Sequence, residues 1–201
     1  MSEKLSKDLI QDRICQMIYR AETFIKWAVL LFNLYEKESE KYKDNLEKMN
    51  EYNKDAITSC MVLHHVLYFQ EAVLVLNTLF EKKSKPSEIS FSYYFLNLEK
   101  SELGLKFDNI RKEYDKTNLA KVRNVLIAHK KIEVIGDPEI GFFNPFNEDI
   151  VEEANLIVFK LKTLVRDYFK GASYNFFESL YRPAFEAFYN NCEKYLNKLI
   201  L

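Results

Sequence analysis

The sequence has few of the residues that interrupt helices or build turns. Glycine and proline occur four times each in 201 residues, so turns are scarce and a fold rich in short connections is disfavoured. Hydrophobic residues make up 48% of the chain and charged residues 29%, a balance typical of a globular domain with ample core material. The composition therefore favours a small number of long helices around an aromatic-rich core.

Cysteine and net charge are also low, and each excludes a class of protein. Cys15, Cys60 and Cys192 are odd in number, far apart and without metal-ligand spacing, so we expect reduced core thiols. A net charge of −1 excludes the global basic field of a general nucleic-acid binder. Any contact with RNA must then come from a local patch. The N-terminus is charged and lacks an apolar signal region, which indicates a cytoplasmic protein.

The first helical pattern begins near the N-terminus. Over residues 5–35 apolar side chains recur at three- and four-residue spacing, which predicts an amphipathic helix with one core-facing stripe. Residues 36–53 are mostly polar, and only a few apolar residues continue the pattern. We predict there a helical extension that frays into a connection.

Residues 55–80 are nearly all apolar, and the run is long enough to span a membrane. Polar residues stand at its middle, where lipid tolerates them least: His64, His65, Gln70 and Glu71. We therefore interpret the segment as a central core helix and expect no membrane contact. Adjacent residues project about 100° apart on a helix, so the two histidines cannot chelate one metal ion. We expect one inside and one at the surface.

The second half of the chain predicts two more long helices and a loop. Residues 107–131 and 148–170 carry helical periodicity. Residues 132–147 contain two glycines and two prolines and form the one predicted loop, directly after the first of these helices. A further amphipathic helix is expected near the C-terminus.

The whole chain, residues 1–201, is predicted to form a single all-α domain. No second domain, repeat or low-complexity segment is visible in the sequence. The predicted fold is a bundle of about four to six helices, with its core over about 5–170 and a C-terminal helical extension over about 173–201.

One short segment combines residues that can carry chemistry. Residues 121–130 read Lys-Val-Arg-Asn-Val-Leu-Ile-Ala-His-Lys, and only here do a His, an Arg and a carboxamide lie within about two helical turns. The four residues from Val125 to Ala128 are apolar and, at 100° steps, point to every side of a helix. Such a helix must be buried all round. One side faces the chain's own core, and the other needs a second cover, most economically a partner subunit.

This segment resembles the signature of the HEPN superfamily (higher eukaryote and prokaryote nucleotide-binding domains), in which an Arg and a polar residue precede a His by a few positions. Here these residues are Arg123, Asn124 and His129. The small residue before the His and the lysine after it are similar to the abortive-infection branch, which often has an acidic residue where this chain has Lys131. The resemblance covers roughly residues 5–170. It implies an all-α homodimer with a composite site, acting as a metal-independent endoribonuclease.

The resemblance also implies a biological setting. Members of the abortive-infection branch are toxin-type ribonucleases of antiviral defence, so RNA is the expected substrate. An antitoxin or other regulatory protein is a candidate partner. Neither the RNA sequence preference nor the trigger can be read from the residues.

The residue types themselves suit cleavage of RNA by its own 2′-hydroxyl. A neutral His129 can take or return a proton near neutral pH. Arg123 can hold the phosphate and stabilise the extra charge of the transition state, and Asn124 can orient either partner through hydrogen bonds. No carboxylate cluster suited to Mg²⁺ stands near the segment in the sequence, which agrees with a route that uses no metal and no cofactor.

Each of these residues also has a simpler interpretation. Lys121, Lys130 and Lys131 are candidate RNA-binding residues, but a solvated helix end has the same composition. His129 continues a core-facing row and could be a half-buried helix-terminal His bonded to a free carbonyl. Arg123 alone could be an exposed surface residue. It is their combination that favours a functional site.

The spacing within the motif favours a homodimer. Six positions correspond to about 9 Å along a helix and a divergence of about 120°, so one subunit does not aim Arg123 and His129 at one phosphate. A two-fold axis beside this helix places both kinds of residue around one cleft. Two other functions fit the sequence: a HEPN-like module that binds nucleotide or a partner protein without cleaving RNA, and a helical interaction protein without an active site.

Overall fold

The computed structural model describes residues 7–81, 102–129 and 147–169, together with residues 179, 183, 186, 187, 190, 191 and 194. Within these residues it has six α-helices and no strand, which confirms the predicted all-α bundle. The α-helices are α1 (Lys7–Ser39), α2 (Leu46–Lys54), α3 (Ala56–Phe80), α5 (Glu102–Tyr114), α6 (Asn118–His129) and α7 (Glu148–Tyr168), and the short 3₁₀ helix η1 (Glu40–Tyr42) follows α1.

Several predictions concern residues outside this description. The predicted loop 132–147 lies outside it except for Asn147, and so do Lys130, Lys131 and most of the C-terminal extension 173–201. Those predictions stay predictions.

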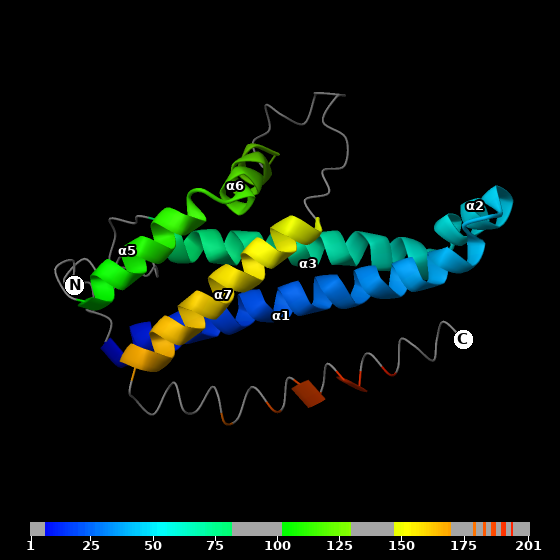
Figure 1. Ribbon diagram of the computed structural model, residues 1–201. Helices are drawn as coiled ribbons and strands as arrows, with labels where there is room; N and C mark the ends of the chain where they lie inside the picture. Colours follow the sequence, from blue (N-terminus) through cyan, green and yellow to red (C-terminus); the bar gives the residue numbers. More distant parts are fainter. Residues whose placement is uncertain are drawn as a thin grey trace, which may run out of the picture.

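The antiparallel pair of α1 and α3 forms the centre of the bundle (Figure 1). The buried stripe of α1 is Ile14, Ile18, Ala21, Ile25 and Ala28, each at most 1% exposed. It packs against buried apolar residues of α3, among them Phe69, Ala72, Val73 and Leu76. The alanines allow the two helix axes to approach closely. This packing confirms the predicted amphipathic and core helices.

Helix α3 is the most apolar of the described helices, so its length and surroundings decide whether it could span a membrane. Within the described residues, one helical segment, Thr58–Phe80, is long and apolar enough to cross a membrane by length and composition, with a mean hydropathy of 1.4. In this structure α3 packs against α1, α2 and α6. The two histidines divide as expected, because His65 is 3% exposed while His64 is only half-buried.

The end of the α1–α3 pair next to α2 has a small core of its own. Leu30, Leu31, Leu34 and Met61 are buried there, with Trp27 and Tyr68 packed against them. The helix does extend past residue 36 and ends at Ser39, as the predicted fraying extension requires, but the separate helix α2 that starts at Leu46 was not predicted. Asn45 explains the restart: its side chain accepts a hydrogen bond from the Lys48 N–H at 3.0 Å, a typical N-cap.

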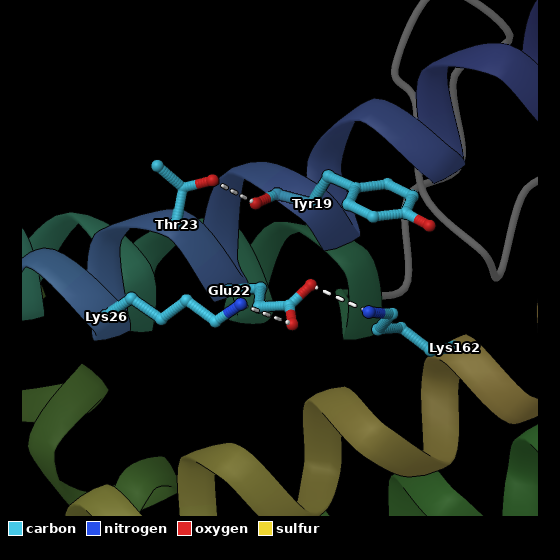
Figure 2. A network of polar contacts seen from close by, with 5 residues as sticks. All are labelled: Tyr19, Glu22, Thr23, Lys26 and Lys162. Atoms are coloured by element: carbon cyan, nitrogen blue, oxygen red, sulfur yellow. Dashed lines mark hydrogen bonds and ion pairs between the residues drawn. The ribbon is translucent and has the colours of Figure 1, made fainter. Parts of the chain in front are cut away.

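Helix α7 crosses α1 and is joined to it by a polar network (Figure 2). The Lys162 ammonium of α7 donates to Glu22 of α1 at 2.9 Å, and Lys26 approaches the other oxygen of that carboxylate at 3.3 Å. Lys162 also lies over the ring of Tyr19, 5.0 Å from its centroid. Both partners of the Glu22–Lys162 pair are 21% exposed, so water screens it less than a surface pair. The network fixes α7, and α7 in turn positions α6.

Candidate functional site

The motif lies after a sharp corner that the sequence did not predict. The single helix expected over residues 107–131 is wrong, since α5 ends at Tyr114 and α6 starts at Asn118. The Thr117 N–H and hydroxyl both donate to the Tyr114 carbonyl oxygen, at 3.0 and 2.6 Å. Short polar side chains such as Thr and Asn compete with helical hydrogen bonds in this way. The apolar periodicity continues on both sides of the corner, so the sequence pattern did not predict that the helix is interrupted.

A carboxylate from α7 holds the start of α6. Glu153 accepts hydrogen bonds from the backbone N–H of Asn118 at 2.9 Å and of Leu119 at 3.3 Å, and from the side-chain amide of Asn118 at 3.3 Å. The first N–H groups of a helix have no partner within it, and a negative charge there is favourable. This contact therefore caps α6 and fixes its place against α7.

The three motif residues all lie on α6. Arg123 is in its middle, Asn124 follows, and His129 is its last residue. Six positions on one continuous helix give the predicted separation of about 9 Å along the axis. The description of residues 124–129 covers their backbone only, so the Asn124 and His129 side chains and the apolar run from Val125 to Ala128 lie outside it.

The described part of α6 has a buried and an exposed side. Leu119 is fully buried and Val122 is 5% exposed, as the predicted core-facing row requires. Lys121 is exposed, and its ammonium donates to the Asn118 side-chain oxygen at 3.0 Å. Of the three predicted RNA-binding lysines, it is the one within the described residues.

Arg123 is not a surface arginine. It is half-buried, and its Nε atom is shielded from solvent without a hydrogen-bond partner in the described part of the chain. A buried donor that stays unpaired costs about 1–3 kcal/mol, and more when it belongs to a charged group. The expectation of an exposed surface arginine is therefore wrong, and an acceptor would stabilise the Nε.

Tyr114, at the end of α5, is a second residue with a buried polar atom that the sequence did not suggest. Its ring stacks on Phe80 with a centroid distance of 4.5 Å, and its hydroxyl is buried with no hydrogen-bond partner among the residues described. Burial raises the pKa of the Tyr114 hydroxyl well above its usual value, and the positive charge of Arg123 acts in the opposite direction.

Other potentially reactive side chains lie outside the motif, on α1 and α3. Cys15 is buried as expected, whereas Cys60 is exposed on α3, so the prediction of core thiols is wrong for Cys60. Its sulfur lies 3.2 Å from Nδ1 of His64 on the outer face of the helix. Among the described residues, no three His, Cys, Asp or Glu side chains group so as to hold a metal ion.

No protein-family model, no curated protein and no solved structure matches this chain. The resemblance of the α6 motif to the HEPN signature therefore stays a prediction.

Proposed function

We propose that this chain is a metal-independent endoribonuclease of the toxin or abortive-infection type, a cytoplasmic homodimer that acts on RNA. The observation that carries the proposal is the half-buried Arg123 on α6, with its Nε unpaired among the described residues. A guanidinium in such a place is stabilised by an anion that fits its fork, and a phosphodiester is such an anion. Asn124 and His129 on the same helix supply the other groups that cleavage requires.

The proposed reaction uses the substrate's own 2′-hydroxyl. The 2′-oxygen attacks the adjacent phosphorus while His129 accepts its proton, and a bond forms between O2′ and phosphorus. The bond from phosphorus to O5′ breaks, and a protonated His129 returns a proton to the leaving oxygen. The products are a 2′,3′-cyclic phosphate and a 5′-hydroxyl. Arg123 stabilises the additional charge of the transition state, and Asn124 orients the His or the phosphate.

The remaining elements of the proposal concern partners. Because Arg123 and His129 diverge on one helix, the proposed site takes groups from both subunits. Lys121, together with Lys130 and Lys131, adds local positive charge for the RNA backbone despite the net charge of −1. An antitoxin or other regulatory protein would keep the activity in check.

Replacement of Arg123 or His129 tests the proposal through the loss of RNA cleavage. Arg123→Ala and His129→Ala are each expected to lower RNA cleavage by about 10²- to 10³-fold, because both act in the transition state. Arg166→Ala is the matched control, since Arg166 is 60% exposed on α7. Circular dichroism and sedimentation confirm that all variants fold and associate alike. Full activity in the Arg123 or the His129 variant contradicts the proposal.

Analysis of the products in the same assay tests the reaction type. Activity is expected to survive EDTA, to leave 2′,3′-cyclic phosphate ends and to vanish on DNA of the same sequence. Loss on chelation with recovery on adding Mg²⁺ contradicts the metal-free route. If the folded dimer binds nucleotide but cleaves no RNA, the non-catalytic HEPN-like module is the better function. Growth arrest on expression, absent with Arg123→Ala, tests the toxin role.

A further inference from the structure

A groove between α1 and α3 lies outside the candidate site on α6. Its volume is about 420 Å³, and residues of these two helices line it. A volume of this size is typical of sites that hold small organic molecules. Arg20 lines the groove, and it projects about 200° away from Glu22, which contacts Lys162 of α7. The α1–α3 groove therefore lies on the side of α1 that is turned away from α7.

The least exposed residues that line the α1–α3 groove are apolar. Met17 of α1 and Leu74 of α3 are half-buried, and Val75 of α3 is buried. Free energy is gained when an apolar group of a ligand covers such side chains, and a methionine side chain adapts its shape to an aromatic ring. The lining therefore favours a ligand with a flat, partly apolar body.

Two arginines of α1 line the α1–α3 groove. Arg13 and Arg20 are seven positions apart, which places them on one face of the helix and about 10.5 Å apart along its axis. Arg13 donates to the neutral side-chain oxygen of Gln16 at 3.2 Å and has no ion pair among the described residues. A guanidinium of this kind binds a phosphate through its fork of N–H donors. The Arg13 end of the groove therefore favours an anion.

The Arg20 end of the groove offers donors and an acceptor side by side. The Arg20 guanidinium lies 3.9 Å from the carboxylate of Glu71 on α3, which is longer than a hydrogen bond, so both groups can still bind a ligand. It also lies over the ring of Phe24, 5.2 Å from the centroid, and this contact favours its position. Guanine matches the pair, because its O6 accepts from an arginine and its adjacent N1–H and N2–H groups donate to a carboxylate.

We infer that the α1–α3 groove binds a guanine nucleotide. The phosphate pairs with Arg13, the purine ring covers Met17 and Leu74, and the edge of the base pairs with Arg20 and Glu71. A fatty acid or another aliphatic anion matches the Arg13 end and the apolar lining, but it offers no donor to the Glu71 carboxylate. The groove shares no residue with the α6 motif, so the inference is independent of the proposed ribonuclease activity.

Calorimetric titration of the full chain with GMP tests the inference. We expect saturable binding, about tenfold tighter than that of AMP, whose base offers the Glu71 carboxylate fewer donors, or of inorganic phosphate, which has no ring. Arg13→Ala is expected to weaken GMP binding about tenfold because the phosphate loses its partner. Arg166→Ala is the matched control, since Arg166 is exposed on α7. Arg123→Ala is also expected to bind GMP like wild type, which separates this groove from the α6 site.

Glu71→Gln tests the recognition of the base. A glutamine amide pairs with adenine rather than guanine, so this variant is expected to bind GMP about tenfold more weakly and to lose the preference for GMP over AMP. Glu152→Gln, at an exposed position of α7, is the control. Arg13 and Glu71 are exposed as well, and circular dichroism confirms that the variants fold alike.

Three results would overturn the inference. They are no saturable GMP binding up to about 5 mM, equal affinities of the wild type for GMP and AMP, and wild-type GMP affinity in Arg13→Ala. The last of these, combined with loss of GMP binding in Arg123→Ala, would place the nucleotide on α6 instead. None of the three bears on RNA cleavage, which Arg123→Ala and His129→Ala test separately.

Discussion

Two half-buried arginines, Arg111 on α5 and Arg123 on α6, show what a covered guanidinium requires. Arg111 is 18% exposed and pairs with Asp108 at 2.9 Å, so its charge is compensated on its own helix. For Arg123 no such ion pair exists among the described residues. Leaving a buried donor such as the Arg123 Nε without an acceptor is unfavourable, and functional sites are where proteins keep such groups. The contrast supports the proposed phosphate contact.

A buried histidine on α3 predicts how stability responds to pH. His65 is 3% exposed, its ring lies 5.6 Å from that of Phe32, and its Nδ1 is 3.3 Å from the Met61 carbonyl oxygen. Burial lowers the pKa of His65, and the contact with Met61 opposes this only in part. The folded protein therefore binds the proton less readily than the unfolded chain. Stability is fully present above the unfolded pKa of about 6.5 and is lost as the pH falls from there through the lower folded pKa.

We expect the free energy of unfolding to fall between pH 7.5 and 5.5 by at most about 1.4 kcal/mol per pH unit from this one group. Urea denaturation of wild type, His65→Gln and His64→Gln at both pH values checks this. His65→Gln is expected to lose the pH dependence, while His64→Gln keeps it, because His64 is only half-buried. Equal pH dependence in wild type and His65→Gln contradicts the argument.

At the scale of elements, the position of α6 depends on a residue in another helix. Glu153→Ala removes the acceptor for the N–H groups of Asn118 and Leu119. We expect a loss of about 1–2 kcal/mol in the free energy of unfolding and faster amide exchange at these two positions. RNA cleavage is expected to fall as well, because Arg123 is carried by the same helix. Glu152→Ala, an exposed neighbour with the same charge change, serves as the control. Equal effects of the two substitutions would show that the cap does not position α6.

The helices that could be predicted are those whose apolar pattern matches their bounds. Residues 55–80 and 148–170 were expected as helices, and α3 (Ala56–Phe80) and α7 (Glu148–Tyr168) agree with them closely. The corner at residues 115–117 could not be predicted, because it contains neither glycine nor proline and is made by a threonine that bonds back to Tyr114. Its polar run from Asp115 to Asn118 was the available signal.

The residues of the candidate site also differ in whether the sequence alone could reveal them. Arg123, Asn124 and His129 were found from sequence because they are neighbours on one helix. Glu153 was missed because its contacts with α6 exist only after α7 packs against that helix. Contacts between residues 35 positions apart, such as Glu153 with Asn118, leave no local pattern. Positioning residues of this kind are therefore the part of a site that a single sequence reveals least.

At the scale of the whole molecule, two exposed apolar residues of α7 bear on the proposed dimer. Leu156 and Phe159 are 52% and 65% exposed on α7, within about two turns of Glu153, which holds the start of α6. The run from Val125 to Ala128 on α6 needs cover on more sides than one small bundle readily gives. Burying such residues contributes about 25 cal/mol for each Å² of apolar area, and the cost of association offsets part of this. In the proposed dimer, a second copy of the chain supplies the cover that this run needs.

A mixed dimer tests whether the proposed site is shared between subunits. Chains carrying Arg123→Ala and His129→Ala are co-expressed with different tags, and the mixed dimer is isolated. If each site takes Arg123 from one chain and His129 from the other, one of the two sites in this dimer contains both intact residues. Its activity is then expected to be about half that of wild type, whereas both parent homodimers are inactive. A site contained within one chain predicts a mixed dimer as inactive as its parents, because each chain lacks one of the two groups. A monomer in sedimentation at micromolar concentration would exclude the shared site altogether.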